Sequence, residues 1–507
     1  MIMNEEQYRE LCETCDQVLK STDSTFETKC ISWLHIIREH PIFLRDYECI
    51  YERKHLILKN ISLSIFDLRN KLSWIKSFLL SLMQSYNNAY IIRTVHAQFD
   101  IIIVSHLLNK EGLRQDYDFY FGSLPGELYS NNINVLMVYI NHTGERIYNN
   151  KLVESNRKIP YIVLPDNLKF FDEVNIFRRL NKESKRLLSK SKNEKNKKLC
   201  QILKLASKYT LNGKSHTSLR RSIQLAAVIK KYKPTSIMLT YEGHGWERTA
   251  FYAAREANPN IYCIGYQHAA LFRLQHGIQR DLGNKFDPDH ILTAGLVSEN
   301  QLKNMSSLHG KKITVLGSNK IVDNYRYEKS KKYLETFDGV CLVLPEGILS
   351  ECEMLFKFSL ECAKYLPEVE FVWRLHPIMN FNSLVKKERV FADLPKNVKL
   401  SDNSFDEDLT NCRWVLYRGS TAVLNALQAG ARPIYYQREN EMTIDPLYEL
   451  NDWKVVVSKA AQFVKVVKSD QGRDKDMSIS GKEEAKKYAK RFYVPFDIGK
   501  IENLIRF

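Results

Sequence analysis

The sequence predicts an α/β protein built from two doubly wound lobes that follow a helical N-terminal region. The chain has 507 residues, enough for roughly three domains of about 150 residues, and its 44% apolar content is ordinary for a globular protein. From about residue 90, short apolar runs alternate with helical stretches, which is typical of parallel βαβ units. This alternation is interrupted once, around residues 319–337, where the chain becomes charged and uneven. We therefore expect two α/β lobes joined by a linker.

Residues 1–88 form the helical N-terminal region of this prediction, with an amphipathic helix over residues 64–85. The first fifteen residues are acidic and polar, unlike a signal peptide. The best apolar stretch, residues 74–83, contains Lys76 and is too short to span a bilayer. Ten scattered cysteines suit a reducing compartment, and we read the single CxxC at Cys12 and Cys15 as part of a helix face. These features predict a cytoplasmic protein.

Residues 89–325 form the predicted first lobe. Each of its expected strands is a β-branched or aromatic apolar run: YIIRTV, DIIIVSHLL, VLMVYI, IPYIVL, SIMLT, IYCIGYQ, HILTAG and KITVLG.

Residues 326–480 form the predicted second lobe. Its expected strands lie in GVCLVL, EFVW, VKLS, WVLY and RPIYYQ, with helices between them. The remaining residues, 481–507, read as a C-terminal helix that packs back on the first lobe.

The net charge of +16 is concentrated in one place. Residues 178–221 hold 15 Lys and Arg but 2 Asp and Glu, so the rest of the chain is close to neutral. This basic segment looks like an exposed helix or a flexible insertion in the first lobe. Its single aromatic residue, Tyr209, does not provide the stacking surface that single-stranded nucleic acid uses. Nucleic acid is therefore an unlikely partner, although binding through this segment remains an alternative function.

Unusual polar residues follow several strands of the predicted second lobe. In open parallel sheets, ligands bind beyond the carboxyl ends of the strands. Arginine and histidine there can hold a phosphate, while glycine and hydroxyl residues before a helix allow close approach of an anion. The expected donor-binding residues are Arg374, His376, Pro377, Glu346, Gly347, Arg418, Gly419, Ser420, Thr421 and Asn425. The spacing is not that of a P-loop.

The first lobe carries the second candidate group. Glu242 stands at a strand end before Gly243, where a carboxylate has little structural reason to be, and it is a candidate general base or nucleophile. The expected acceptor-binding residues are His244, Trp246, Glu247, Gln267 and His268. His106 and residues 122–126 are weaker strand-end candidates.

These motifs together resemble the GT-B glycosyltransferases of bacterial surface-polysaccharide synthesis. More narrowly, the chain is similar to capsule and lipopolysaccharide enzymes that use CMP-activated acidic sugars such as Kdo and sialic-type nonulosonates. His376-Pro377 matches their His-Pro motif, Ser420-Thr421 their serine-rich motif, and Glu242-Gly243 their acidic motif. Two departures concern the donor more than the fold: Ser-Thr replaces Ser-Ser, and one carboxylate rather than two precedes the glycine.

The resemblance implies a GT-B fold with a cleft between its lobes and a metal-independent transfer that needs no cofactor beyond the nucleotide-sugar. Glu242 and His376 are the catalytic residues, and the acceptor is a glycan or a lipid-linked saccharide. The basic segment is then expected to attract the protein to the anionic inner face of the cytoplasmic membrane. The alternatives are a GT-B transferase with a UDP- or GDP-sugar and a CDP-glycerol or CDP-ribitol phosphotransferase.

Overall fold

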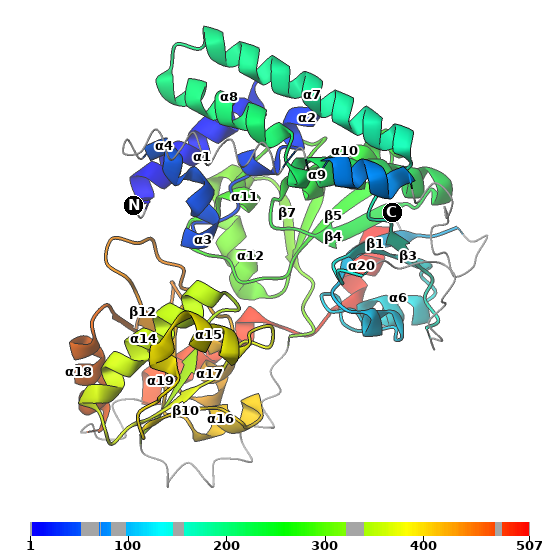
Figure 1. Cartoon of the computed structure of the whole chain (residues 1–507). Coiled ribbons are helices and arrows are strands. Elements are labelled where there is room, and N and C mark those ends of the chain that lie inside the picture. The colour runs from blue at the N-terminus through cyan, green and yellow to red at the C-terminus, as the bar shows by residue number, and fades with distance from the viewer. Residues whose placement is uncertain are drawn as a thin grey trace.

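The structure is a computed structural model, and it describes residues 3–51, 70, 72, 74–82, 98–145, 157–320, 339–471 and 479–505. These residues form two α/β lobes with a helical layer beside the first (Figure 1). The predicted fold class, a GT-B-like pair of doubly wound lobes, is confirmed by their two parallel sheets.

The first lobe is built on a seven-stranded sheet in the order β3-β2-β1-β4-β5-β6-β7, and all its neighbouring strands are parallel. Most residues of its strands are buried, as expected when helices cover both faces. The strands are β1 (Ile101–Leu107), β2 (Val135–Asn141), β3 (Tyr161–Leu164), β4 (Ser236–Thr240), β5 (Tyr262–Gln267), β6 (His290–Thr293) and β7 (Lys312–Val315).

The second lobe has a six-stranded parallel sheet in the order β10-β9-β8-β11-β12-β13. Counted from β8, this is the strand order 3-2-1-4-5-6 of a Rossmann sheet. The strands are β8 (Val340–Leu344), β9 (Glu370–Trp373), β10 (Val398–Leu400), β11 (Trp414–Tyr417), β12 (Arg432–Tyr436) and β13 (Val455–Val457).

The predicted strands of both lobes are confirmed except at two places. The run YIIRTV lies outside the described residues, as do the expected borders at 88/89 and 325/326. The edge strand β13 was not predicted, since its three valines are too few to show a pattern.

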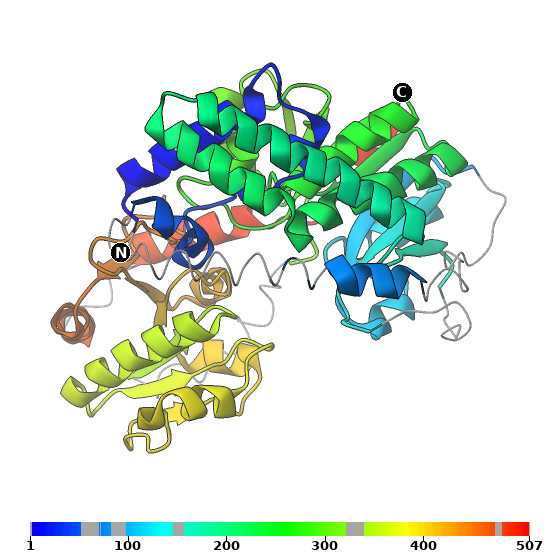
Figure 2. The same cartoon turned by 45° about the horizontal axis from the view of Figure 1, so that its top comes forward.

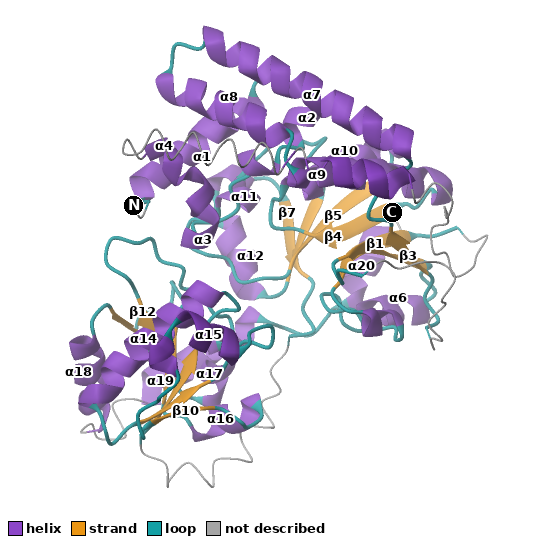
Figure 3. Cartoon of the chain, viewed as in Figure 1, coloured by secondary structure: helices purple, strands orange, loops and turns teal. Residues whose placement is uncertain are grey.

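Helices cover both sheets (Figure 3). Those associated with the first sheet are α6 (Leu124–Ser130), α9 (Gly213–Tyr232), α10 (Gly245–Ala257), α11 (His276–Gln279) and α12 (Leu296–Lys303). Those of the second lobe are α14 (Leu349–Tyr365), α15 (Phe381–Lys387), α16 (Phe405–Asn411), α17 (Val423–Ala429) and α18 (Ala460–Gln471). The 3-10 helices are Ser32–Leu34, Arg45–Tyr47, Lys110–Leu113, Ser306–Leu308 and Arg389–Phe391.

The two C-terminal helices run along both lobes. Residues Ala485, Ala489 and Phe492 of α19 (Ile479–Phe492) share a core with second-lobe residues and with α12 of the first lobe. α20 (Ile498–Ile505) then buries Ile501 and Ile505 in the core of the first lobe beside α6.

The basic segment is not a flexible insertion. It folds mainly into α7 (Phe170–Asn193) and α8 (Lys197–Thr210), which pack on each other and on the N-terminal helices (Figure 2). Residues Leu187, Ile202, Leu203 and Ala206 share a core with Leu11 and Leu34 of the N-terminal region. The N-terminal helices are α1 (Glu5–Lys20), α2 (Phe26–Lys29), α3 (Pro41–Leu44) and α4 (Glu48–Tyr51). Residues 74–82 of the predicted amphipathic helix are also helical.

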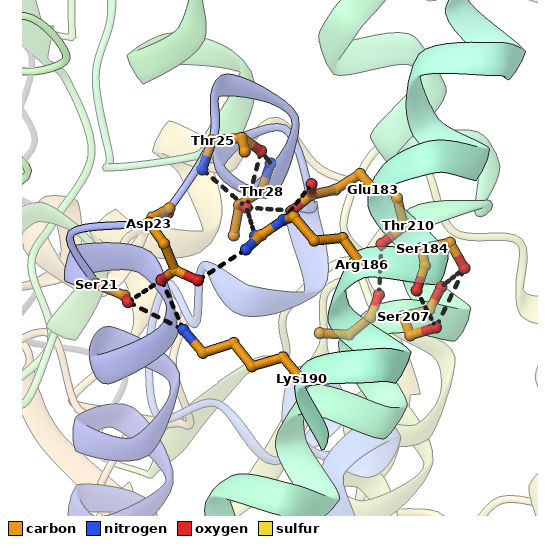
Figure 4. A network of polar contacts seen from close by, with 12 residues as sticks. Ser21, Asp23, Thr25, Thr28, Glu183, Ser184, Arg186, Lys190, Ser207 and Thr210 are labelled. Atoms are coloured by element: carbon orange, nitrogen blue, oxygen red, sulfur yellow. Dashed lines mark hydrogen bonds and ion pairs between the residues drawn. The ribbon is translucent and has the colours of Figure 1, made fainter. Parts of the chain in front are cut away.

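Acidic residues of the N-terminal region neutralise part of the basic segment. Asp23 forms ion pairs with Arg186 and Lys190, at 2.9 and 2.6 Å, and the hydroxyl of Thr28 contacts Glu183 (Figure 4). Two further cations of the segment are paired with the N-terminal region, Arg179 with Glu27 and Lys198 with Glu10, while Arg220 pairs with Glu173 of α7. About a third of the basic charge is therefore used inside the fold.

All ten cysteines are free thiols. Over the described ranges, none of the helices has the length and apolar character needed to cross a bilayer.

Candidate functional site

Strand order places the candidate residues at equivalent points of the two sheets. In the first sheet β1 lies between β2 and β4, and in the second β8 lies between β9 and β11. Each arrangement is a switch point, where successive connections leave the sheet in opposite directions and open a crevice at the carboxyl edge. Glu242 follows β4 and His106 lies in β1, while Glu346 follows β8 and Gly419 follows β11.

Glu242 lies among cationic and imidazole side chains. Its Oε2 is 3.4 Å from Nε2 of His244 and 3.7 Å from a terminal nitrogen of Arg38. Burial alone would raise the pKa of Glu242, but Arg38, His244 and His268 outweigh it and hold the pKa well below its usual range. Desolvation would lower the pKa of His244, yet Glu247 and Glu242 raise it. Glu242 is therefore an ionised carboxylate at neutral pH.

Glu247 shapes the loop that carries Glu242. Its Oε2 accepts hydrogen bonds from the backbone N–H groups of Glu242, Gly243 and His244, at 3.0, 2.8 and 2.8 Å. Gly243 has φ +88°, and a Cβ there would collide with the backbone of Gly277, so glycine is required. Burial raises the pKa of Glu247 to about 7. Glu247 thus holds the loop from behind rather than facing a ligand.

The other first-lobe candidates line the same strand ends. His106 Nδ1 lies 2.8 Å from His142 Nε2, and its ring packs edge-on against Trp246 at 5.5 Å. Burial lowers the pKa of His268 to about 4, and its Nδ1 is buried with no hydrogen-bond partner. Gln267 is fully buried and donates to the backbone oxygen of Ala269.

The weaker candidates at residues 122–126 lie at the start of α6. Ser123 and Gly126 line a separate hollow of about 450 Å³ together with Asp116, Lys158 and Ile498. This hollow shares no lining residue with the Glu242 group, so the structure does not join the two.

Three loops of the second lobe converge around Glu346. Gly419 has φ +67°, and a Cβ at this position would collide with Oε1 of Glu346. A Cβ at Gly347 would lie 2.8 Å from Nδ1 of His376, so both glycines allow neighbouring loops to approach. Partial burial lowers the pKa of His376, although the nearby Glu346 opposes the shift. The strand ends of β8, β9 and β11 therefore form one group.

The two arginines expected to bind the donor are held by carboxylates of their own lobe. Arg374 donates to Asp408 at 2.7 Å. Arg418 is buried, with 1% of its side chain exposed, and forms ion pairs with Glu351 and Glu441. Both arginines thus brace loops.

The hydroxyl groups of the residues that follow β11 do not cap the next helix, α17. α17 has seven residues and begins after Ala422, without a side-chain hydrogen bond at its N-cap. Ser420 is 9% exposed, Thr421 is exposed, and Asn425 is partly buried. Pro377 is exposed beside His376.

A segment of the N-terminal region connects the two groups. Arg38 approaches Glu242 of the first lobe, and His40 Nε2 lies 3.1 Å from Oε2 of Glu346 in the second. Because His40 Nδ1 accepts from the backbone N–H of Ile42, its Nε2 carries the proton that Glu346 accepts. The carboxyl ends of the two sheets therefore face each other across residues 38–40.

Lys320 joins the same region from the end of the first lobe. Its pKa is lowered by burial, which the charge of Glu242 partly offsets. Its Nζ lies 5.8 Å from the ring centre of Tyr493, whose hydroxyl neighbours Thr421. Arg38, His40 and Lys320 were not predicted as site residues, because none of them follows a strand in a recognisable motif.

Among the residues that the structure describes, no group of three or more His, Cys, Asp or Glu side chains is placed to hold a metal ion. A transfer without metal or cofactor stays a prediction.

Neither a family model nor a curated protein matches the chain. Among solved structures it is similar to a glycosyltransferase from Rickettsia africae (12% identity, TM-score 0.45, covering 81% of this chain and 98% of that one). It is also similar to MurG from Acinetobacter baumannii (10%, 0.44, 81% and 99%) and to the UDP-GlcNAc 2-epimerase from Neisseria meningitidis bound to UDP-GlcNAc (15%, 0.42, 80% and 100%). These likenesses are weak, and the fold described above rests on the chain's own two sheets.

Proposed function

We propose that the protein is a glycosyltransferase that moves an acidic sugar, such as Kdo or a sialic-type nonulosonate, from a CMP-sugar to a surface glycan or a lipid-linked saccharide. One observation carries this proposal. An ionised carboxylate, Glu242, and a phosphate-compatible group, His376 with Ser420 and Thr421, occupy the switch points of two sheets whose carboxyl ends meet at residues 38–40. Transfer between two bound substrates needs two such sites side by side.

The second lobe would hold the nucleotide. The imidazole of His376 and the hydroxyls of Ser420 and Thr421 can donate hydrogen bonds to a leaving phosphate. Gly347 and Gly419 let the side chains of His376 and Glu346 pack close to these loops, and Pro377 and Asn425 flank the same loops. Arg374 and Arg418 form ion pairs with carboxylates of the same lobe. Their proposed role is therefore to position these loops and not to bind the donor directly.

The first lobe would hold the acceptor. Because Glu242 is ionised, it can take the proton of the acceptor hydroxyl as that oxygen attacks the anomeric carbon. If it attacks that carbon itself, a covalent intermediate forms and the configuration is retained. The anomeric configuration of the product distinguishes these two roles. His244, Trp246 and His268 surround the acceptor side, and Glu247 holds the loop.

We also propose that the protein acts at the cytoplasmic face of a membrane. Arg178, Lys182, Lys185 and Lys192 are exposed, and their spacing puts them on one side of α7. Such a stripe favours attraction to anionic lipid, where a lipid-linked acceptor would lie.

A thermal-shift panel of CMP, CDP, UDP and GDP tests the donor. A nucleotide at 100 times its dissociation constant should stabilise the fold by about 2.7 kcal/mol. We expect CMP or CDP to give the largest shift and His376→Ala to remove it. Lys303→Gln, on the surface of α12, is the control and should keep the shift. Stabilisation by UDP or GDP alone would instead identify one of the alternative donors.

A further inference from the structure

Three side chains around Glu242, two cations and one imidazole, have polar atoms that the fold does not pair. The Nε of Arg38 and the Nδ1 of His268 are buried without a hydrogen-bond partner. In the described part of the chain, Lys320 has no ion-pair partner within 4 Å, although Glu242 influences its pKa. Buried donors are normally satisfied, so a group of this kind points to a missing acceptor.

The charges around these side chains also favour a bound anion. Among the described residues, Glu242 is the carboxylate within ion-pair distance of Arg38, and its charge also acts on Lys320, whereas Glu247 accepts hydrogen bonds from the backbone of its own loop. Arg38 and Lys320 therefore share Glu242 as their neighbouring carboxylate. Arg38 is also held in place, because its guanidinium lies 5.3 and 5.5 Å from the ring centres of Phe43 and Phe272.

These three side chains also lie beside the predicted reaction centre. Arg38 is two residues from His40, which contacts Glu346 of the donor lobe. Lys320 lies over Tyr493, beside Thr421 of the donor loop. An anion bound here would lie between the predicted base and the predicted nucleotide site.

We infer that Arg38, Lys320 and His268 form a subsite for the carboxylate of an acidic sugar, so that the N-terminal region supplies part of the active site. This inference rests on the proposed transferase function. The planar guanidinium of Arg38 suits a carboxylate, which it can bind with two parallel hydrogen bonds. The acidic sugar is either the unit being transferred or the terminal unit of the acceptor.

Calorimetric titration of the full-length protein distinguishes the two sources. In the donor arm, CMP and CMP-N-acetylneuraminate are titrated into the wild type, Arg38→Gln, Lys320→Gln and the surface control Lys303→Gln. In the acceptor arm, sialyllactose and its carboxyl methyl ester are titrated in the presence of saturating CMP. The ester keeps the shape of the sugar and removes its charge.

We expect Arg38→Gln and Lys320→Gln to weaken one of the two acids by roughly tenfold to a hundredfold, the value of a charge-assisted hydrogen bond. CMP alone should bind all four proteins equally. If the two variants bind CMP-N-acetylneuraminate more weakly than the wild type does, the subsite holds the transferred sugar. If the wild type binds sialyllactose more tightly than its ester, the subsite holds the acceptor.

The inference is overturned if neither acid binds at millimolar concentration, or if both acids bind the variants as they bind the wild type. Failure of the transferase proposal looks different, because CMP itself would then not bind the wild type. The preference for sialyllactose over its ester remains measurable in that case without nucleotide. Matching unfolding temperatures of the variants confirm that they fold.

Discussion

The carboxyl ends of the two sheets contain similar residue types, but the two lobes use their cations differently. In the second lobe Arg374 and Arg418 form hydrogen-bonded ion pairs with carboxylates of the same lobe. Beside the first lobe, Arg38 of the N-terminal region lies 3.7 Å from its carboxylate partner Glu242, beyond hydrogen-bond distance. A cation that is fully paired supports structure, whereas one with unused donors can serve a ligand. The donor-lobe arginines are therefore structural, as is the buried Arg248 of the acceptor lobe, which pairs with Asp287, whereas Arg38 and Lys320 keep donors unused beside Glu242.

The largest effect is expected when the first-lobe carboxylate is neutralised. Glu242→Gln should reduce turnover by about a hundredfold to ten-thousandfold, because the amide can neither take a proton nor act as a nucleophile. The nucleotide-induced thermal shift should be unchanged, since the donor loops are separate. Turnover is followed by release of CMP from the sugar donor. Normal turnover of this variant would remove Glu242 from the catalytic role.

The paired arginine of the second lobe should matter for stability instead. Arg418→Met leaves Glu351 and Glu441 buried without their cation, and we expect a loss of about 3–5 kcal/mol in the free energy of unfolding. Urea denaturation measures this loss. Lys399→Gln, which breaks an exposed pair with Glu370, is the control and should cost less than about 1 kcal/mol. Equal, small losses in both variants would contradict a structural role for Arg418.

Glu247, which holds the loop that carries Glu242, makes a smaller, pH-dependent contribution to the free energy of unfolding. The folded protein keeps a proton on Glu247 up to about pH 7, whereas an unperturbed glutamate releases it near 4.5. The folded state therefore binds more protons across this window, and the contribution of Glu247 to stability falls as pH rises, by up to about 3 kcal/mol.

Glu247→Gln removes this dependence, because the amide does not ionise. We expect the unfolding free energy of the variant, relative to the wild type, to rise between pH 4.5 and pH 8. Denaturation at these two pH values measures the difference, with the exposed Glu368→Gln as control. A difference that stays constant with pH would show that Glu247 is ionised throughout.

Most strands could be predicted from the sequence because their signal is local. The run IMLT before Glu242 and the run VLY before Arg418 are buried β-forming segments bounded by turn residues. β13 was not predicted, because an edge strand of three residues is too short to show a pattern of alternating hydrophobic residues. The expected site residues were found by the same local rule, namely polar groups placed directly after strands.

Two α/β lobes, the order of their strand-end motifs and the concentration of basic charge in residues 178–221 could all be read from the amino-acid sequence. Tertiary structure alone decided which charges are paired. Asp23 and Glu27 neutralise parts of α7, and His40 reaches Glu346 across 306 residues of chain. Such contacts leave no trace in local periodicity, because the partner of a charged group depends on where distant segments cross. Whether an arginine braces a loop or is free for a ligand is therefore decided only when the chain has folded.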